Sequence, residues 1–286
     1  MHVDNFLGNI FVRCDRGCNF RLSIERIYMQ DFVHLHVHTQ YSLLDGQASV
    51  SRLVDKAMKD GMKGIAVTDH GNMFGIKEFT NYVNKKNSGP KGEIKDLKKR
   101  IAGIESGEIE CEDKEAEIAD CRAKMAEAES KLFKPIVGCE MYVARRTMDK
   151  KEGKPDQSGY HLIVLAKNEK GYHNLIKLVS HAWTRGYYMR PRTDRSELEK
   201  YHEGLIVCSA CIGGEVPKKI INDQLEEAEE AVRWYKNLFG DDYYLELQRH
   251  KATVPRANHE AYPLQQKANA CLLYTSPSPR DISGSR

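Results

Sequence analysis

Apolar and polar positions in the first part of the chain form a pattern that predicts a strand, a helix and a second strand. Residues 32–38 alternate apolar side chains with histidines, which is the two-residue period of a β-strand. Apolar residues at helical spacing follow at 49–62, and the apolar run 64–67 leads into a turn. This order of elements indicates a βαβ unit with a parallel sheet.

The same rhythm returns in the second half of the chain. The predicted strands lie at 134–144, 160–168, 204–210 and 242–250, and the predicted helices at 171–183 and 224–240. Polar residues stand at the carboxyl ends of these strands, as they do in β/α barrels. We therefore predict an α/β fold of the barrel type.

Residues 88–134 do not fit this rhythm. They are rich in Glu, Lys and Ala, with apolar residues at heptad-like spacing, such as Ile94, Leu97, Ile101 and Ile104. The pattern is typical of a solvated, charged helical hairpin inserted into a loop, which is what we expect here. A coiled coil that binds a partner is the alternative, and the sequence indicates no particular partner.

The two ends also differ from the rest. Residues 1–28 show no clear period and stop just before Met29, an alternative start, so we treat them as an extension of doubtful origin. Residues 272–286 interrupt a helical pattern with a Ser/Pro run, and we expect this tail to be non-native. The domain is therefore expected to occupy residues 29–271.

The composition of the chain is typical of a soluble globular protein. The chain has 286 residues, 41% of them hydrophobic, and a formal net charge of +3, which neither demands nor forbids nucleic acid. No apolar run is long enough for a membrane span and no signal peptide is evident, so we expect a cytoplasmic location. The eight cysteines are scattered, and we expect reduced thiols.

The histidine-rich run suggests chemistry. On a strand, His34, His36 and His38 would share one face, and Asp45 in the following turn could return toward them. Imidazole is the commonest metal ligand, so the run predicts a metal cradle. The alternative is a solvated polar face of an edge strand.

Several motifs resemble, in order and wording, a known family. The segments "FVHLHVHTQYSLLDG", "AVTDHGNMFG", "KPIVGCEMYVA" and "EGLIVCSACIGGEVP" are similar to the polymerase and histidinol phosphatase (PHP) domain at the start of bacterial DNA polymerase III alpha subunits. His-x-His followed by Thr-Asp-His is shared by all PHP proteins. The segment "GYHNLIKLVSHAWTRGYYMRPR" is more specific, because it resembles the replicative polymerases and not the phosphatases.

The resemblance implies a distorted seven-stranded β/α barrel, here truncated at its C-terminal end, that holds two or three divalent ions of zinc, manganese or iron. Carried over position by position, it implies these metal ligands: His36, His38, Asp45, His70, Glu140, His161 and Cys211. Glu140 matches the bridging carboxylate, and His34 is expected to lie behind the ligands rather than among them.

Each of these ligands has a plainer alternative. Glu140 ends an apolar run, which suits a bridge, but it could be a solvated strand-end residue. His70 could cap the next helix, and His161 could be a hydrogen-bonded core residue. Cys211 follows the apolar run that contains Cys208, and its CxxC spacing has no second copy, so a structural zinc site is not expected.

Three functions follow from the resemblance. The first is the PHP module of a replicative DNA polymerase, which trims 3' ends as a metal-dependent exonuclease or braces the polymerase domain. The second is a free-standing PHP phosphoesterase, and the third is a metal-stabilised structural module. The implied partners are DNA, the rest of the polymerase chain, the sliding clamp and the proofreading subunit, with no membrane; the full protein's polymerase domain would use Mg²⁺.

The chain by itself is expected to be inactive. Family members close the metal site with an Asn-Asp-x-His motif on a later strand, and none occurs after residue 248. The palm and fingers domains of the polymerase are absent as well. A cluster formed by Arg185, Arg190, Arg192 and Arg195 near Tyr187 and Tyr188 suits either phosphate contacts with base stacking or packing against the polymerase domain.

Overall fold

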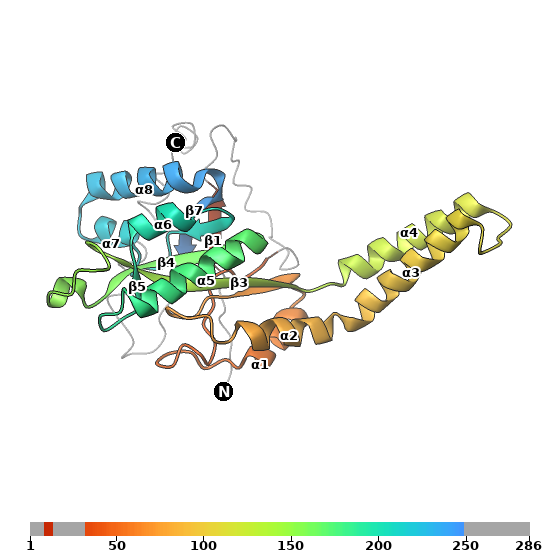
Figure 1. Ribbon diagram of the computed structural model, residues 1–286, viewed down its shortest axis with the longest axis horizontal. Coiled ribbons are helices and arrows are strands. Elements are labelled where there is room, and N and C mark those ends of the chain that lie inside the picture. The colour runs from red at the N-terminus through yellow and green to blue at the C-terminus, as the bar shows by residue number, and fades with distance from the viewer. Residues whose placement is uncertain (1–8, 14–31, 249–286) are drawn as a thin grey trace, which may run out of the picture.

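The protein is built around one curled sheet. The computed structural model describes residues 9–13 and 32–248. Within these residues, six strands pair in the order β1-β7-β6-β4-β3-β2, and a seventh, β5, pairs with β3 (Figure 1). The strands are β1 (Asn9–Arg13), β2 (Gly64–Val67), β3 (Lys134–Ala144), β4 (Gly159–Ala166), β5 (Arg192–Thr193), β6 (Leu205–Cys208) and β7 (Tyr243–Gln248).

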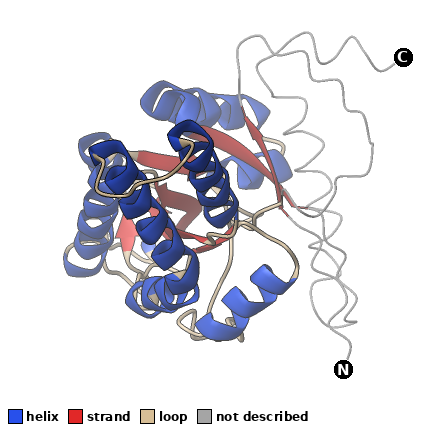
Figure 2. Cartoon of the chain, turned by 90° about the vertical axis from the view of Figure 1, so that its right-hand side faces the viewer, coloured by secondary structure: helices blue, strands red, loops and turns tan. Residues whose placement is uncertain are grey.

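Helices surround the strands, so the sheet forms a half barrel with its helices outside (Figure 2). The α-helices are α1 (Val50–Lys59), α2 (Ile76–Lys86), α3 (Ser88–Ser106), α4 (Lys114–Ser130), α5 (Glu169–Thr184), α6 (Arg195–Tyr201), α7 (Glu215–Ile221) and α8 (Leu225–Phe239). The predicted α/β class is confirmed, and the helices expected at 49–62, 171–183 and 224–240 are α1, α5 and α8.

The sheet is mixed, which corrects the expected parallel pattern. The pairs β2–β3, β3–β5 and β6–β7 are parallel, whereas β1–β7, β3–β4 and β4–β6 are antiparallel. Strands β3 and β4 are joined by a loop that holds only a 3₁₀ turn at Lys154–Asp156. A parallel pair needs a longer crossover, usually a helix, so these two strands run in opposite directions.

The seven strands of the described residues include five of the six strands that the sequence pattern predicts. The expected strand at 32–38 is wrong, because this segment is not a regular strand, while β1 and the two-residue β5 were not expected. The 32–38 segment runs beside β2, where the amides of Ala66 and Thr68 donate to the carbonyls of His34 and Val37 at 2.9 and 2.8 Å. These bonds hold the histidine run against the sheet without a full ladder.

The core lies on both faces of the sheet. On the outer face, Leu175, Leu178 and Val179 of α5 pack against buried residues of β3, β4 and β6. Burial of one such leucine stabilises the fold by about 1.5–3 kcal/mol. Helix α5 begins where the side chain of Asn168 accepts a hydrogen bond from the amide of Gly171 at 2.9 Å, which satisfies one open donor of the first turn.

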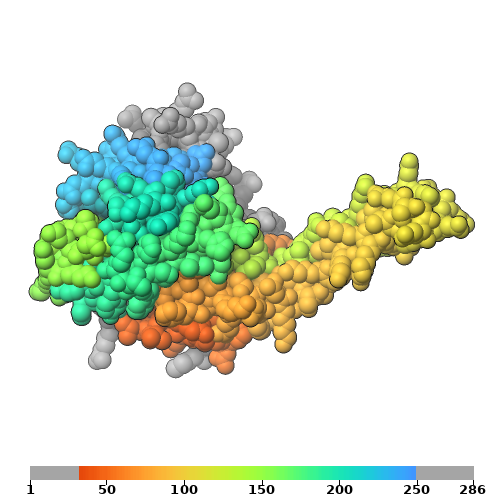
Figure 3. All heavy atoms as spheres, viewed as in Figure 1, coloured from red at the N-terminus to blue at the C-terminus, as the bar shows by residue number. Residues whose placement is uncertain are grey.

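Helices α3 and α4 form an arm, residues 88–130, that projects from the body of the protein (Figure 3). Gly103 and Ile104 of α3 and Cys121 and Ala128 of α4 are the buried positions of the arm, so its apolar seam lies between its own helices. At its base the side chain of Asn87 bonds the backbone of Phe133, accepting from N at 3.0 Å and donating to O at 2.8 Å. The arm therefore begins and ends at adjacent points of the body.

Candidate metal centre

Histidines from distant parts of the chain converge on one carboxylate. Glu140 is a fully buried residue of β3, and this strand pairs with the segments that carry His70 and His161. His70, which follows β2, bridges Glu140 directly, and His161 stands on β4 opposite Tyr142. The alternation of β3 thus directs Glu140 inward between its two neighbouring strands.

Glu140 is within reach of four imidazoles. Its Oε1 lies 2.7 Å from Nδ1 of His161 and 3.3 Å from Nε2 of His36, and its Oε2 lies 3.6 Å from Nε2 of His38. Nδ1 of His70 faces the same Oε2. Two groups of possible metal ligands result, His36–His38–Glu140 and His70–Glu140–His161, each with its ligand atoms within 4.8 Å of one another. Glu140 is common to both groups, as a bridging carboxylate would be.

Asp45 and Cys211 lie at the edge of this arrangement. The Oδ2 atom of Asp45 is 2.9 Å from Nε2 of His70, and its side chain is largely exposed. The Sγ atom of Cys211 is 3.5 Å from Nδ1 of His161 and 3.9 Å from Oε1 of Glu140. The structure therefore brings both residues to the centre, although neither belongs to the two groups.

The loop that carries Cys211 is tightly fitted to His161. Ala210 has a left-handed backbone with φ of 61°. A Cβ atom on Gly213 would lie 3.0 Å from the His161 ring, and one on Gly214 would lie 2.1 Å from the carbonyl oxygen of Ser209. Glycine at these two positions lets the loop approach the centre closely, because any larger residue would push it away.

His34 is not part of the centre. It does not belong to either ligand group, and its ring packs edge-on against Phe32 with centroids 4.8 Å apart. The expectation that three histidines share one face fails because residues 32–38 do not have the regular alternation of a strand.

Glu246 of β7 is a functional candidate that the sequence reasoning missed. It is fully buried, its Oε1 lies 2.8 Å from Nδ1 of His36, and it accepts a hydrogen bond from Nε2 of Gln248 at 2.8 Å. A carboxylate on the far nitrogen of a histidine fixes the tautomer and orients the ring toward a metal. The signal was present in "YYLELQ", where a glutamate interrupts an otherwise apolar and aromatic strand.

Asp69 is the second residue that was missed. Buried beside His70, it accepts hydrogen bonds from the amide and hydroxyl of Thr39 at 2.7 and 2.8 Å and from the hydroxyl of Ser42 at 2.8 Å. The Ser42 hydroxyl also lies 3.1 Å from Nδ1 of His38. Asp69 thereby holds the 39–46 loop in place and leaves Nε2 of His38 directed at the centre.

The electrostatics of the centre are dominated by burial and by the histidine–carboxylate contacts. Burial opposes ionisation of Glu140, but hydrogen bonds from His161, His36 and His70 outweigh it and hold the pKa of Glu140 well below its usual value. Burial likewise lowers the pKa of His36, yet Glu246 and Glu140 raise it overall to about 10. For His38 burial prevails and lowers the pKa to about 4. Burial raises the pKa of the Cys211 thiol to about 12.

The donors fit a bound cation. Among the described residues, Oε2 of Glu246 is a buried atom that has no hydrogen-bond partner, and the buried atoms Nδ1 of His70 and Oε2 of Glu140 face each other across the centre. Nε2 of His36 and Nε2 of His38 face each other at 3.3 Å, so each directs a ligand atom at the same space. Buried polar atoms normally find partners, and an ion is one way to satisfy them. Imidazole with carboxylate is a donor set suited to zinc, manganese and iron.

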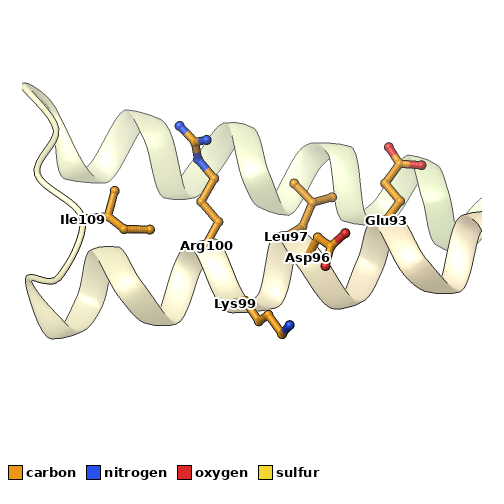
Figure 4. A pocket seen from close by; sticks show the side chains of 6 residues that line it. All are labelled: Glu93, Asp96, Leu97, Lys99, Arg100 and Ile109. Carbon is orange, nitrogen blue, oxygen red and sulfur yellow. The ribbon is translucent and has the colours of Figure 1, made fainter.

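The arm carries a surface hollow that is lined by charged and aliphatic side chains instead of histidines. It has a volume of about 570 Å³ and lies on the arm, where Figure 4 shows its lining side chains: Glu93, Asp96, Leu97, Lys99, Arg100 and Ile109. Lys99 points away from the other side chains in this view. The hollow is lined only by residues of the arm, so it is separate from the histidine cluster.

These features agree with a comparison with known proteins. The family model of the PHP domain matches residues 34–250. The chain therefore belongs to the PHP domain family, and the sheet described above corresponds to part of a PHP barrel.

The relatives narrow this class. The chain is 43% identical over 220 residues to the DNA polymerase III subunit alpha of Borreliella burgdorferi, over 77% of this chain and 15% of that protein. It is 39% identical to the same subunit of Treponema pallidum, again over 77% and 15%, and 34% identical to that of Aquifex aeolicus, over 86% and 18%. The chain thus spans less than a fifth of the length of these relatives.

Within the described residues, no helix is long and apolar enough to cross a membrane.

Proposed function

We propose that this chain is the PHP domain of a DNA polymerase III alpha subunit and that its histidine cluster holds two divalent metal ions. One observation carries the proposal: Glu140 is common to two ligand groups, which is the arrangement of a carboxylate that bridges two ions. When bound, such ions act as Lewis acids and lower the pKa of a coordinated water from 15.7 to about 7.

Each residue has a defined place in this proposal. His36 and His38 hold the first ion, His70 and His161 hold the second, and Glu140 bridges them. Asp45 and Cys211 lie close enough to add ligands, and they would be part of a third site if the cluster is trinuclear. Glu246 holds His36 in orientation rather than binding an ion itself.

The exposure of the cluster favours a catalytic role in the full protein over a purely structural one. The side chains of His38, His70 and His161 are 22%, 23% and 24% exposed, whereas Glu140 and Glu246 are sealed beneath them. Structural zinc sites are closed, while catalytic sites keep a position open to water or substrate. This open side supports metal-dependent hydrolysis of a phosphodiester, and hence 3'–5' exonuclease action.

The parent protein is proposed to synthesise DNA in the cytoplasm with a Mg²⁺-dependent polymerase domain, in contact with DNA, a sliding clamp and a proofreading subunit. The relatives above all carry the name of the polymerase subunit, which disfavours a free-standing phosphoesterase. We propose that the chain by itself binds metal but trims DNA poorly.

Metal content tests the proposal directly. Elemental analysis of the purified chain should find about two divalent ions per molecule, and the double variant His36→Ala, His38→Ala should lose about one of them. Glu140→Gln should lose both, because the bridge belongs to both groups. His173→Ala is the matched control, since His173 is an exposed histidine of α5 outside the cluster. Equal metal content in the wild type and the double variant would contradict the assignment.

A further inference from the structure

A strip of exposed aromatic side chains lies beside the candidate metal centre. Phe74 is 65% exposed, Trp183 41% and Tyr187 48%. The ring centroids of Phe74 and Trp183 are 6.1 Å apart, and those of Trp183 and Tyr187 are 5.6 Å apart with the rings nearly parallel. We call these three residues the aromatic strip. Contiguous apolar side chains at a surface commonly mark an interaction site.

Short contacts tie the strip to the centre. The indole nitrogen of Trp183 donates to the carbonyl of Gly71 at 2.7 Å, and Gly71 directly follows His70. Asn72 accepts from the amide of Phe74 at 3.1 Å and donates to the carbonyl of His70 at 3.0 Å. The same short loop thus positions an imidazole in the centre and an aromatic ring in the strip, so the two sites have a fixed relation.

The structure also sorts the arginines that the sequence places together. Arg192 is buried and donates to three backbone carbonyls, so it is a structural residue. Arg185 and Arg195 each pair with a buried glutamate. Arg190 is exposed and has no acidic partner within residues 9–13 and 32–248. Of the four, it is the one whose charge is available to a ligand.

Arg190 lies close to the metal centre, over the ring of Tyr142. Its guanidinium lies 5.9 Å from the centroid of the Tyr142 ring. That ring is in turn 6.2 Å from the ring of His70 and 5.2 Å from the ring of His161. An available cation therefore lies one aromatic ring away from the second ligand group, His70–Glu140–His161.

We propose that the aromatic strip and Arg190 bind the unpaired end of a single-stranded DNA and deliver its terminal phosphodiester to the metal centre. This inference rests on the proposed function and names the substrate class of that site. Bases stack on aromatic rings without regard to sequence, and arginine contacts the backbone phosphates. A duplex end would be excluded, because its bases are already stacked and paired. A purely protein-binding patch would leave the unpaired Arg190 at the centre unexplained.

The test measures binding by the whole chain, independently of any cleavage. Anisotropy of a fluorescent oligothymidylate at low ionic strength gives the Kd. Tyr187→Ala, Phe74→Ala and Arg190→Gln should each weaken binding about five-fold or more, since one stacked base contributes on the order of 1–3 kcal/mol. Leu225→Ala and Arg233→Gln are matched controls on α8, where an exposed leucine and an exposed arginine lie outside the strip.

Intrinsic fluorescence adds a second measurement. The chain has two tryptophans, Trp183 in the strip and Trp234 beneath the guanidinium of Arg195 at 4.6 Å. Oligothymidylate should quench the emission of the wild type, and Trp183→Phe should remove most of that quenching while it keeps an aromatic ring in place. Quenching that persists in Trp183→Phe would place the DNA elsewhere and overturn the proposal.

Metal analysis of the same preparations separates the two ideas. Weaker DNA binding by the strip variants with unchanged metal content supports the inference. If the wild type holds no metal but the strip variants still bind DNA less tightly than the wild type does, the proposed metal-dependent function is wrong and the DNA-binding role of the aromatic strip is supported. Unchanged Kd values, equally tight binding of a duplex, or a dimer that Tyr187→Ala dissociates in sedimentation would each overturn the DNA site.

Discussion

The metal centre and the arm use charged residues in opposite ways. In the centre, contacts join residues far apart in the chain, such as His36 and Glu246, which are separated by 210 positions and both buried. On the arm, charges pair locally and in solvent, as in Lys124–Asp120 within one helix and Arg100–Glu117 between its two helices. Exposed pairs contribute about 0–1 kcal/mol each, whereas buried charges need a partner or an ion. The centre therefore depends on every donor, and the arm depends on none in particular.

Metal removal should give the largest effect. A chelator should lower the Tm of the metal-loaded chain by about 10 °C or more. The estimate follows because each of the two proposed ions at 100 times its Kd adds about 2.7 kcal/mol, and 1 kcal/mol shifts Tm by about 2–4 °C at this size. Differential scanning calorimetry with and without chelator measures this shift. A shift below about 3 °C would mean that the centre, like the arm, adds little to stability.

Loss of the Glu246 carboxylate should have the next largest effect. Glu246→Gln removes the partner that orients His36, and such changes cost about 10- to 100-fold in metal affinity. Competition with a chromophoric chelator gives the affinity. Glu117→Gln on the arm removes an exposed carboxylate of the same kind and should leave the affinity unchanged. Equal metal affinities of Glu246→Gln and Glu117→Gln would show that a buried carboxylate of the centre matters no more for metal binding than an exposed one on the arm.

The metal-free chain should become less stable as pH rises above neutrality. In the folded state the pKa of His36 is raised to about 10, above the 6.5 of an unfolded histidine. The protonated ring therefore stabilises the fold fully below about pH 6.5, and this contribution is lost as pH rises toward about 10. Thermal melts between pH 6 and 10 should show a steeper decline for the wild type than for His36→Gln. Parallel curves for the two would exclude His36 as the cause.

Deletion of the arm should have the smallest effect. Replacing residues 91–132 with a short Gly/Ser link keeps Asn87 and Phe133, whose contacts close the base, and loops tolerate such changes at small entropic cost. We expect Tm to fall by less than about 8 °C and metal content to stay at the wild-type value. A larger fall in a thermal melt would show that the arm packs on the body.

Local patterns predicted most of the elements. The helices α1, α5 and α8 and the strands β3 and β4 follow from periodicity, since neighbouring residues alone decide it. The direction of β4 relative to β3 did not follow, because it depends on a connection without a helix. Helices α2, α6 and α7 were not predicted either, and two of them have only seven residues.

The site was predictable only where the family resemblance supplied the residues. His36, His38, His70, Glu140 and His161 are brought together as the resemblance implies, and their binding of metal remains a prediction. Glu246 and Asp69 were missed because their roles come from tertiary contacts that no local spacing records. The prediction of a strand at 32–38 was wrong because the conformation of that segment also depends on tertiary contacts, here its hydrogen bonds with β2 and Thr68.

The position of Glu140 within β3 sets a limit on changes of chain length. Its backbone is paired in the ladder with Ile163 of β4, and its side chain reaches the centre from that fixed register. A single residue inserted between the arm and Glu140, inside β3, would bring Cys139 or Met141 to the inward position, whereas residues added at the tip of the arm would move nothing in the sheet. We therefore expect this chain to tolerate added or removed residues between 107 and 113 but not a changed spacing from Lys134 to Glu140.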